Sequence, residues 1–362
     1  MVASFVHDVP ASRVVFGNGA IVSVGDEVAR LGCRRVFLVS GRSEASFAAV
    51  IGEQLGARLV GEFDDVVMHV PVEIAGAAVA AARAVDADVV VAVGGGSSTG
   101  TAKAIALETH LPVLAVPTTY AGSEMTNIWG LTENGRKTTG RDDAVLPRTV
   151  VYDPELTLTL PAALSAASGM NALAHLVEGL YAPAVSPILA QQAEEGVRAL
   201  ASSLPRVVAD PSDVDARGDA LYGAWLAGWI LGTTGMGVHH KICHTLGGTY
   251  NLAHAASHSA VISYATQYNQ DDAAAAMSAI VRAFAAAGRP ADDAPSAVWQ
   301  LAHDIGAPTS LQSIGFDESS FDEASAIVVA GNPTNPRRVD LDGVRSLLMA
   351  AYRGTRPSGR LA

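Results

Sequence analysis

Six of the ten histidines lie in two stretches of the second half of the chain: His175, His239, His240, His244, His254 and His258. In the first stretch, Asn171, His175 and Glu178 are spaced i, i+4 and i+7, which places them on one face of a helix. In the second, His240 and His244 also share a helical face. Because such paired spacings rarely arise from packing alone, they predict a functional site built from imidazoles.

Two chemistries fit these side chains, and the residue types leave both open. A divalent metal would take His175, His240 and His254 as ligands, but the expected fourth ligand is a carboxylate and Asn171 offers a neutral amide. Without a metal, the same imidazoles are proton donors and, when protonated, cationic sites for an anionic substrate. The predicted substrate-binding residues are Asn171, His239, Lys241 and Arg337. The segment around Arg337 fits a turn that caps the next helix equally well.

A glycine-rich segment in the first half of the chain is a candidate phosphate site. The apolar run 88–93 leads into 94–100 and then into a predicted helix. Glycines let the backbone approach a phosphate, and the free N–H groups at the start of a helix attract it. A purely structural turn is the alternative. The predicted pyrophosphate-binding residues are Gly94, Gly95, Gly96, Ser97 and Ser98.

The next predicted strand, 112–116, leads into a loop that is rich in hydroxyl groups and small residues. Such a loop can cap a helix, and it can also hydrogen-bond ribose, phosphate or the nicotinamide amide. The cofactor-binding residues predicted here are Thr118, Thr119, Tyr120 and Ser123.

The end of the early strand 37–39 bears on the choice between NADH and NADPH. An acidic residue at this place normally binds the adenosine ribose and excludes a 2′-phosphate. The strand continues into Ser40, Gly41, Arg42 and Ser43, with no carboxylate among them. We therefore expect Gly41 and Arg42 to contact the cofactor and NADPH to be accepted besides NADH.

Two domains are expected to position these groups. From residue 13 to about 116, β-branched runs alternate with Ala-rich helical stretches, which is typical of βαβ units with helices on both faces of a parallel sheet. After residues 153–161 the pattern is nearly all helical. We predict a Rossmann-like α/β nucleotide-binding domain over 1–156 and an all-helical substrate-binding and catalytic domain over 157–362. The active site is expected in the cleft between them.

Composition narrows the classes of partner. The chain has 24 Lys and Arg against 36 Asp and Glu, a net charge of −12, which disfavours nucleic acids and anionic membranes as partners. Its two cysteines, Cys33 and Cys243, are far apart and suit a reducing cytoplasm. The stretch 220–238 has no charged residue but several glycines and no basic flank, so we expect a buried helix and loop rather than a membrane span.

These residues and motifs resemble the iron-containing alcohol dehydrogenase superfamily, which has a dehydroquinate-synthase-like fold. The resemblance covers nearly the whole chain, through the loops 94–98 and 118–124, the helix with Asn171 and His175, the segment 240–254 and the late segment 335–337. In metal-dependent members the ligands are an Asp and a His four residues apart and two further His fourteen apart. Those places hold Asn171, His175, His240 and His254, so the resemblance implies a vestigial metal site and no bound metal.

Within that superfamily, three features look like the maleylacetate reductases: Asn171, the short loop 118–124 and the string 239–244. The resemblance implies reduction of maleylacetate to 3-oxoadipate with NADH or NADPH, in the degradation of resorcinol, hydroxyquinol and chlorinated aromatics, by a homodimer. Hydride addition to the conjugated enone would create an enolate. In that mechanism His244 or His254 donates the proton, His240 and His175 stabilise the enolate, and Lys241 anchors a carboxylate.

Four alternatives stay open, and the last of them, a non-catalytic binding protein, would leave the clustered imidazoles unexplained. The first is a metal-dependent alcohol or hydroxy-acid dehydrogenase of the same superfamily that accepts Asn171 as a ligand. The second is a lyase or cyclising enzyme of the dehydroquinate synthase type. The third is a related oxidoreductase that acts on another oxo acid.

Overall fold

The chain divides into two compact units. The structure is a computed structural model that describes residues 5, 7, 9, 11–133 and 136–361. One unit is Val9–Leu160, and the other joins Pro161–Ala362 to the N-terminal segment, from which His7 Nδ1 lies 3.0 Å from Ser186 Oγ. All strands of the described residues belong to the first unit, whereas the second is helical.

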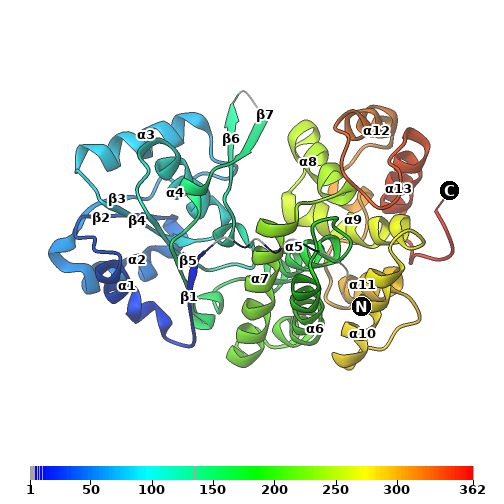
Figure 1. Cartoon of the computed structure of the whole chain (residues 1–362), viewed down its shortest axis with the longest axis horizontal. Coiled ribbons are helices and arrows are strands. Elements are labelled where there is room, and N and C mark those ends of the chain that lie inside the picture. The colour runs from blue at the N-terminus through cyan, green and yellow to red at the C-terminus, as the bar shows by residue number, and fades with distance from the viewer. Residues whose placement is uncertain (1–4, 6, 8, 10, 134–135, 362) are drawn as a thin grey trace. The chain divides into compact units, whose positions relative to one another are not determined.

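The first unit is built around a parallel sheet (Figure 1). Within the described residues its six strands are β1 (Arg13–Phe16), β2 (Val36–Ser40), β3 (Leu59–Phe63), β4 (Val89–Gly94), β5 (Val113–Pro117) and β8 (Thr149–Tyr152). They lie in the order β1-β8-β5-β4-β2-β3, and every pairing is parallel. The α-helices of this unit are α1 (Val24–Arg30), α2 (Ala45–Leu55), α3 (Val72–Ala84) and α4 (Gly96–Thr109).

Helices cover both faces of this sheet. Leu38 and Val91 pack with residues of α1 and α2, whereas their neighbours Phe37 and Val90 pack with residues of α3 and α4. Successive side chains of a strand point to opposite faces, so strands that are buried on both faces are apolar at every position. This explains the unbroken apolar run of β4.

The register of the sheet brings the carboxyl ends of β2, β4 and β5 together. Ser40 pairs with Val93, and Gly94 pairs with Pro117. The three segments that follow these strands therefore begin side by side, at the end of a parallel sheet where ligands bind in α/β folds. The segment after β5 leads into an antiparallel hairpin, β6 (Ile128–Glu133) and β7 (Arg136–Arg141).

The second unit is a bundle of α-helices. Among the described residues these are α5 (Ala162–Leu180), α6 (Pro187–Ala209), α7 (Val214–Thr234), α8 (Val238–Tyr250), α9 (His254–Asn269), α10 (Ala274–Ala286), α11 (Ala294–Asp304), α12 (Phe321–Ala330) and α13 (Leu341–Arg353). The predicted fold, a parallel α/β region followed by a helical region, is confirmed.

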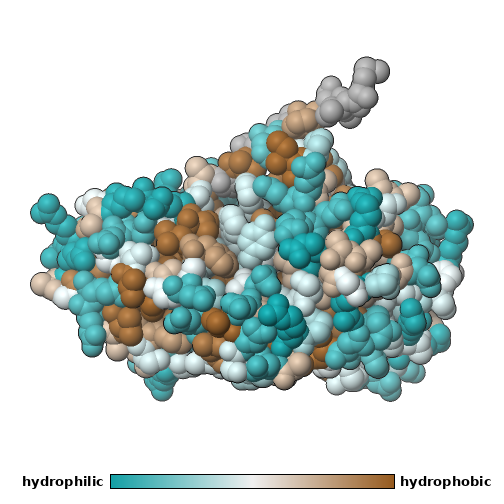
Figure 2. Space-filling model, turned by 90° about the horizontal axis from the view of Figure 1, so that it is seen from below, coloured by the Kyte–Doolittle hydropathy of each residue, from teal (hydrophilic) through white to brown (hydrophobic). Residues whose placement is uncertain are grey.

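The charge-free stretch 220–238 forms most of α7 and the loop before α8. Most of its helical residues are buried, as predicted. In the part of the chain that the structure describes, no helix is long and apolar enough to cross a membrane. The face drawn in Figure 2 is mainly hydrophilic and carries separate apolar patches.

Glycines allow α5 to pack closely against its neighbours. A Cβ on Gly179 of α5 would overlap the side chain of Ile230 on α7, and one on Gly196 of α6 would lie 2.7 Å from Leu176 on α5. As a result α5 is buried at every residue from 169 to 180. The polar side chains in that half of the helix are therefore held by packing.

We predict that Gly179→Ala destabilises the protein by about 1–3 kcal/mol, because the added methyl group has no space beside Ile230. The free energy of unfolding from denaturant titration measures this change. The control is Gly248→Ala in α8, where a Cβ meets no atom within 4 Å of the described structure. The control is expected to be neutral or stabilising by up to about 1 kcal/mol. Equal stability of the two variants would contradict the packing argument.

Candidate functional site

The segment after β4 forms a cradle of backbone at the start of α4. Gly94 has φ +140°, and a Cβ there would overlap Ser98 Oγ. α4 begins at Gly96 and has no side-chain cap on its N-terminus among the described residues. The first N–H groups of a helix have no partner within the helix and attract anions. The predicted residues Gly94 to Ser98 therefore have the geometry of a phosphate site.

The segment after β5 packs directly on this cradle. Thr118 N donates a hydrogen bond to Gly94 O at 3.1 Å, and a Cβ on Gly95 would lie 3.0 Å from Thr119 Cγ2. The two predicted cofactor loops thus form one surface within the first unit. Tyr120, which was also predicted to bind the cofactor, is completely buried, whereas Thr119 and Ser123 keep exposed surface.

The four residues 40–43 at the end of β2 carry no carboxylate, as predicted, but the residue after them is Glu44. The half-buried Glu44 turns back toward the cradle, so that a Cβ on Gly94 would lie 3.6 Å from its carboxyl carbon. Ser43 Oγ donates a hydrogen bond to Glu44 Oε2 at 2.8 Å. Arg42, the expected phosphate ligand, instead pairs with the exposed Asp65 at 2.8 Å. The short 3-10 turn 42–44 brings Glu44, rather than Arg42, back to the strand ends.

The histidine cluster, which we define as the six histidines predicted above, is assembled from three helices. α5 supplies His175, α8 supplies His239, His240 and His244, and α9 supplies His254 and His258. The ring centroid of His240 lies 5.0 Å from that of His175, 4.6 Å from that of His258 and 6.2 Å from that of His244. The His254 and His258 centroids are 4.3 Å apart. The structure thus brings all six predicted histidines together.

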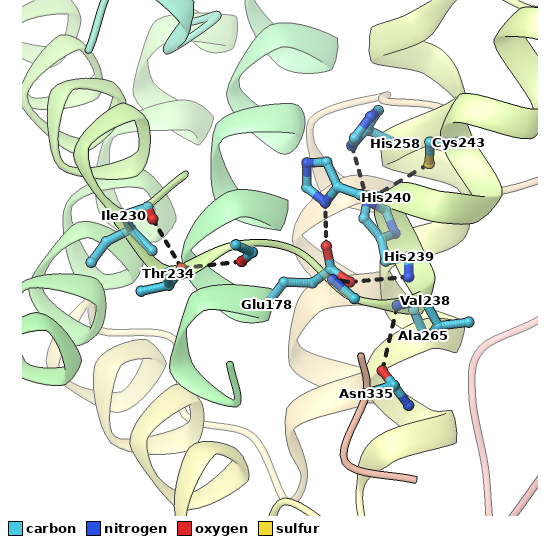
Figure 3. Close-up of polar contacts among 12 residues, drawn as sticks. Glu178, Ile230, Thr234, Val238, His239, His240, Cys243, His258, Ala265 and Asn335 are labelled. Carbon is cyan, nitrogen blue, oxygen red and sulfur yellow. Dashed lines mark hydrogen bonds and ion pairs between the residues drawn. The ribbon is translucent and has the colours of Figure 1, made fainter. Parts of the chain in front are cut away.

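Glu178 of α5 connects the cluster to the backbone (Figure 3). Its Oε1 accepts hydrogen bonds from Gly237 N at 3.1 Å and from His239 N at 3.0 Å, and its Oε2 is hydrogen-bonded to His240 Nδ1. α8 has no side-chain cap of its own, so this carboxylate takes the place of one. Burial raises the pKa of Glu178, whereas the nearby His239 imidazole and the backbone N–H donors act to lower it.

His239 and His258 form the innermost pair of the cluster. Both are completely buried, and His239 Nε2 lies 2.9 Å from His258 Nδ1 (Figure 3). Cys243 Sγ lies 3.8 Å from the same His239 nitrogen. His239 was predicted to bind substrate, but these contacts are those of an internal residue. His258 belongs to the predicted cluster but was given no role; it follows His254 by four residues, so both lie on one face of α9.

Exposure divides the cluster into an inner and an outer part. His244 is exposed and His254 is half-buried, and their rings stack with centroids 6.4 Å apart. His175 and His240 are almost completely buried. Burial lowers the pKa of His175 and His240 well below the usual range, and neighbouring imidazoles lower it further. Burial therefore disfavours the charged form of the inner histidines.

The two cations that were predicted to bind substrate contact other groups. The Lys241 side chain lies against Gly331, where a Cβ would overlap it. The Arg337 guanidinium lies 4.2 Å from the centroid of the Tyr268 ring and donates a hydrogen bond to Leu361 O at 3.1 Å. These contacts support a structural role for Arg337.

Two family models match the chain. The model described as "Iron-containing alcohol dehydrogenase" matches residues 11–154, and "Fe-containing alcohol dehydrogenase family, C-terminal" matches residues 165–352. The chain belongs to the iron-containing alcohol dehydrogenase family. The family resemblance predicted from the motifs is confirmed.

Relatives of known activity are similar over nearly their full length. The chain is 50% identical to the maleylacetate reductase of Sphingobium indicum and 47% identical to that of Pseudomonas sp. strain P51, in each case over 98% of this chain and 99% of the relative. The solved maleylacetate reductase from Agrobacterium tumefaciens is 42% identical, with a TM-score of 0.92 over 98% of this chain and 100% of that chain.

The family name implies iron, so we tested whether the side chains fit it. Three polar atoms are buried and have no hydrogen-bond partner among the described residues, as is expected of atoms that bind a ligand. They are Asn171 Oδ1, His175 Nδ1 and His240 Nε2. All three are neutral, however, and the Glu178 carboxylate is already engaged by backbone N–H groups and by His240. A dication here would have no carboxylate ligand, and Glu178 would compensate its charge only through the imidazole of His240. The donor set therefore does not fit tightly bound iron.

We predict that Glu178→Gln lowers turnover by about 10- to 100-fold, the usual loss when a group that orients an imidazole is removed. The amide keeps the volume but cannot accept hydrogen bonds at both of its polar atoms, so His240 loses its fixed orientation. Steady-state kinetics measure the effect, and the thermal midpoint checks that the variant is folded. Glu195→Gln is the control, because this partly exposed carboxylate pairs only with Arg198 on its own helix among the described contacts. Turnover within twofold of the parent in Glu178→Gln would rule out an orienting role.

Proposed function

We propose that the protein is an NADH-dependent reductase that converts maleylacetate into 3-oxoadipate without a metal. The observation that carries this proposal is the similarity, over nearly the whole chain, to maleylacetate reductases. The neutral donor set around Asn171 supports the metal-free part of it. The homodimer and the cytoplasmic location implied by the resemblance remain predictions.

The cofactor part rests on the cradle at the start of α4. Its glycines leave room for a phosphate, and the uncapped helix terminus attracts one, so the site fits the pyrophosphate of a dinucleotide. When bound, the nicotinamide supplies a hydride to the substrate carbon that is β to the ketone. The task of the protein side chains is then to stabilise the resulting enolate oxygen and to protonate the adjacent carbon.

In this proposal the pair of Glu178 and His240 stabilises the enolate. Because Nδ1 of His240 is held by Glu178, its Nε2 carries a proton only when the imidazole is protonated. Burial opposes that form, but the negative charge of a bound dicarboxylate favours it. His240 Nε2–H then donates a hydrogen bond to the enolate oxygen, with His175 beside it at a centroid distance of 5.0 Å.

The proton that is added to the substrate carbon comes from the outer part of the histidine cluster, His244 and His254. His244 and His254 have exposed surface, so either can exchange its proton with solvent between turnovers. Lys241, whose side chain lies against Gly331, has no role in this proposal.

The decisive experiment is an NADH oxidation assay with maleylacetate on enzyme that has been treated with a chelator and analysed for metals. We expect turnover to persist without bound metal and to need no added iron or zinc. Loss of activity that iron or zinc restores, with turnover of a simple alcohol or aldehyde, would instead identify a metal-dependent dehydrogenase. If neither substrate reacts, a different oxo acid is the substrate.

We further propose that Glu44 makes the enzyme prefer NADH, in place of the NADPH tolerance expected from Arg42. A carboxylate beside the strand ends accepts hydrogen bonds from the adenosine ribose and repels a 2′-phosphate. Glu44→Gln is expected to raise kcat/KM for NADPH relative to NADH by about tenfold, because it removes that repulsion. Asp65→Asn, which changes the exposed partner of Arg42, is the matched control. An unchanged cofactor ratio in Glu44→Gln would refute this assignment.

A further inference from the structure

Lys103 of α4 is a buried cation that the proposed chemistry does not use. It is 1% exposed, and its Nζ has four acceptors within 3.0 Å. These are the carbonyl oxygens of Ser123 at 2.6 Å, Thr126 at 2.7 Å and Ile128 at 2.8 Å, and Thr126 Oγ1 at 3.0 Å. All four belong to the segment that runs from the second cofactor loop into β6.

This set of acceptors requires a cation with several donors. Carbonyl oxygens that converge inside a protein carry partial negative charges that repel one another and have lost their water. An ammonium group offers three N–H donors and a compensating charge. Burial lowers the pKa of Lys103 to about 7, and the buried Glu124 carboxyl of this same segment acts in the opposite direction. Burial of this lysine is thus costly, and its hydrogen bonds offset the cost.

Lys103 holds the far end of the loop 118–126, and other contacts attach the start of this loop. At the start of the loop, Thr118 N is bonded to Gly94 O, and Thr119 packs on Gly95. At its far end the carbonyls of Ser123 and Thr126 are held by Lys103. One helix therefore contributes to both cofactor loops: its N-terminus forms the cradle, and its seventh residue after Gly96 holds the neighbouring loop.

We propose that Lys103 is a positioning residue for the dinucleotide cofactor, whose ammonium group fixes the loop 118–126 against the phosphate cradle. The proposal rests on the proposed function, because it takes these two loops as the cofactor site. Lys103 itself has no exposed surface for the ligand. Its effect is exerted through the backbone that it holds.

The test is Lys103→Met, which keeps the length of the side chain and removes its donors. NADH binding is measured by fluorescence titration, and KM for maleylacetate is measured at saturating NADH. We expect the dissociation constant for NADH to rise at least about tenfold, a loss that corresponds to one or two hydrogen bonds, while KM for maleylacetate stays within twofold. Thr109→Val, at the other end of α4, is the control and should leave both constants unchanged.

Unchanged NADH affinity in folded Lys103→Met would overturn the proposal, as would equal losses for NADH and maleylacetate. If Lys103→Met does not fold, Thr126→Val decides. It removes one of the four acceptors and is expected to weaken NADH binding about three- to tenfold, and unchanged binding would overturn the proposal. Failure of the parent protein to bind NADH would count against the proposed function itself and is therefore distinguishable from failure of the role of Lys103.

Discussion

The Glu178 carboxylate is the group on which the histidine cluster depends. It is buried on α5, yet it receives two backbone N–H groups at the start of α8 and the Nδ1 of His240. A buried charge is tolerated only where hydrogen bonds and dipoles compensate it, and the positive end of α8 supplies both. The same carboxylate that caps the helix therefore fixes the orientation of an imidazole in its first turn.

Close packing of α5 is the condition for this arrangement. Gly179 follows Glu178 directly and lies against Ile230 without room for a side chain, so α5 cannot shift away from α7 without opening a cavity. Burial disfavours the charged form of the inner imidazoles, which limits the charge that the bundle must bury. In the proposed function, positive charge develops there only when a bound anionic substrate favours it. This is physically suitable for a protein whose net charge of −12 would otherwise oppose the binding of a dicarboxylate.

Features that repeat along the chain could be predicted from the sequence, whereas contacts between distant residues could not. The strand pattern predicted the parallel sheet, and the four-residue spacings predicted the helical faces that carry His175, His240 and His244. The contact of Glu178 with His240 joins residues 62 positions apart, so no local pattern indicates it. Glu44 was missed because a three-residue turn reverses its direction, while Arg42 pairs with Asp65. Lys103 has the sequence context of an ordinary helical lysine, and only the path of the loop after β5 surrounds it with carbonyl groups.

Two helix starts show how tertiary contacts decide the function of similar local sequences. α4 and α8 both follow a glycine, Gly95 and Gly237, and neither has a side-chain cap from its own segment among the described residues. Both N-termini would attract an anion if they were isolated. At α8 that place is taken by Glu178, so this terminus binds a protein carboxylate and orients a histidine. At α4 the described neighbours are glycines, small hydroxyl residues and, near Gly94, the Glu44 carboxyl, and none of them caps the helix, so its N-terminus is open to a phosphate. The fold places the Glu178 carboxylate at the N-terminus of α8, which therefore belongs to the histidine site. The N-terminus of α4 has no side-chain cap among the described residues, so it can serve a cofactor loop.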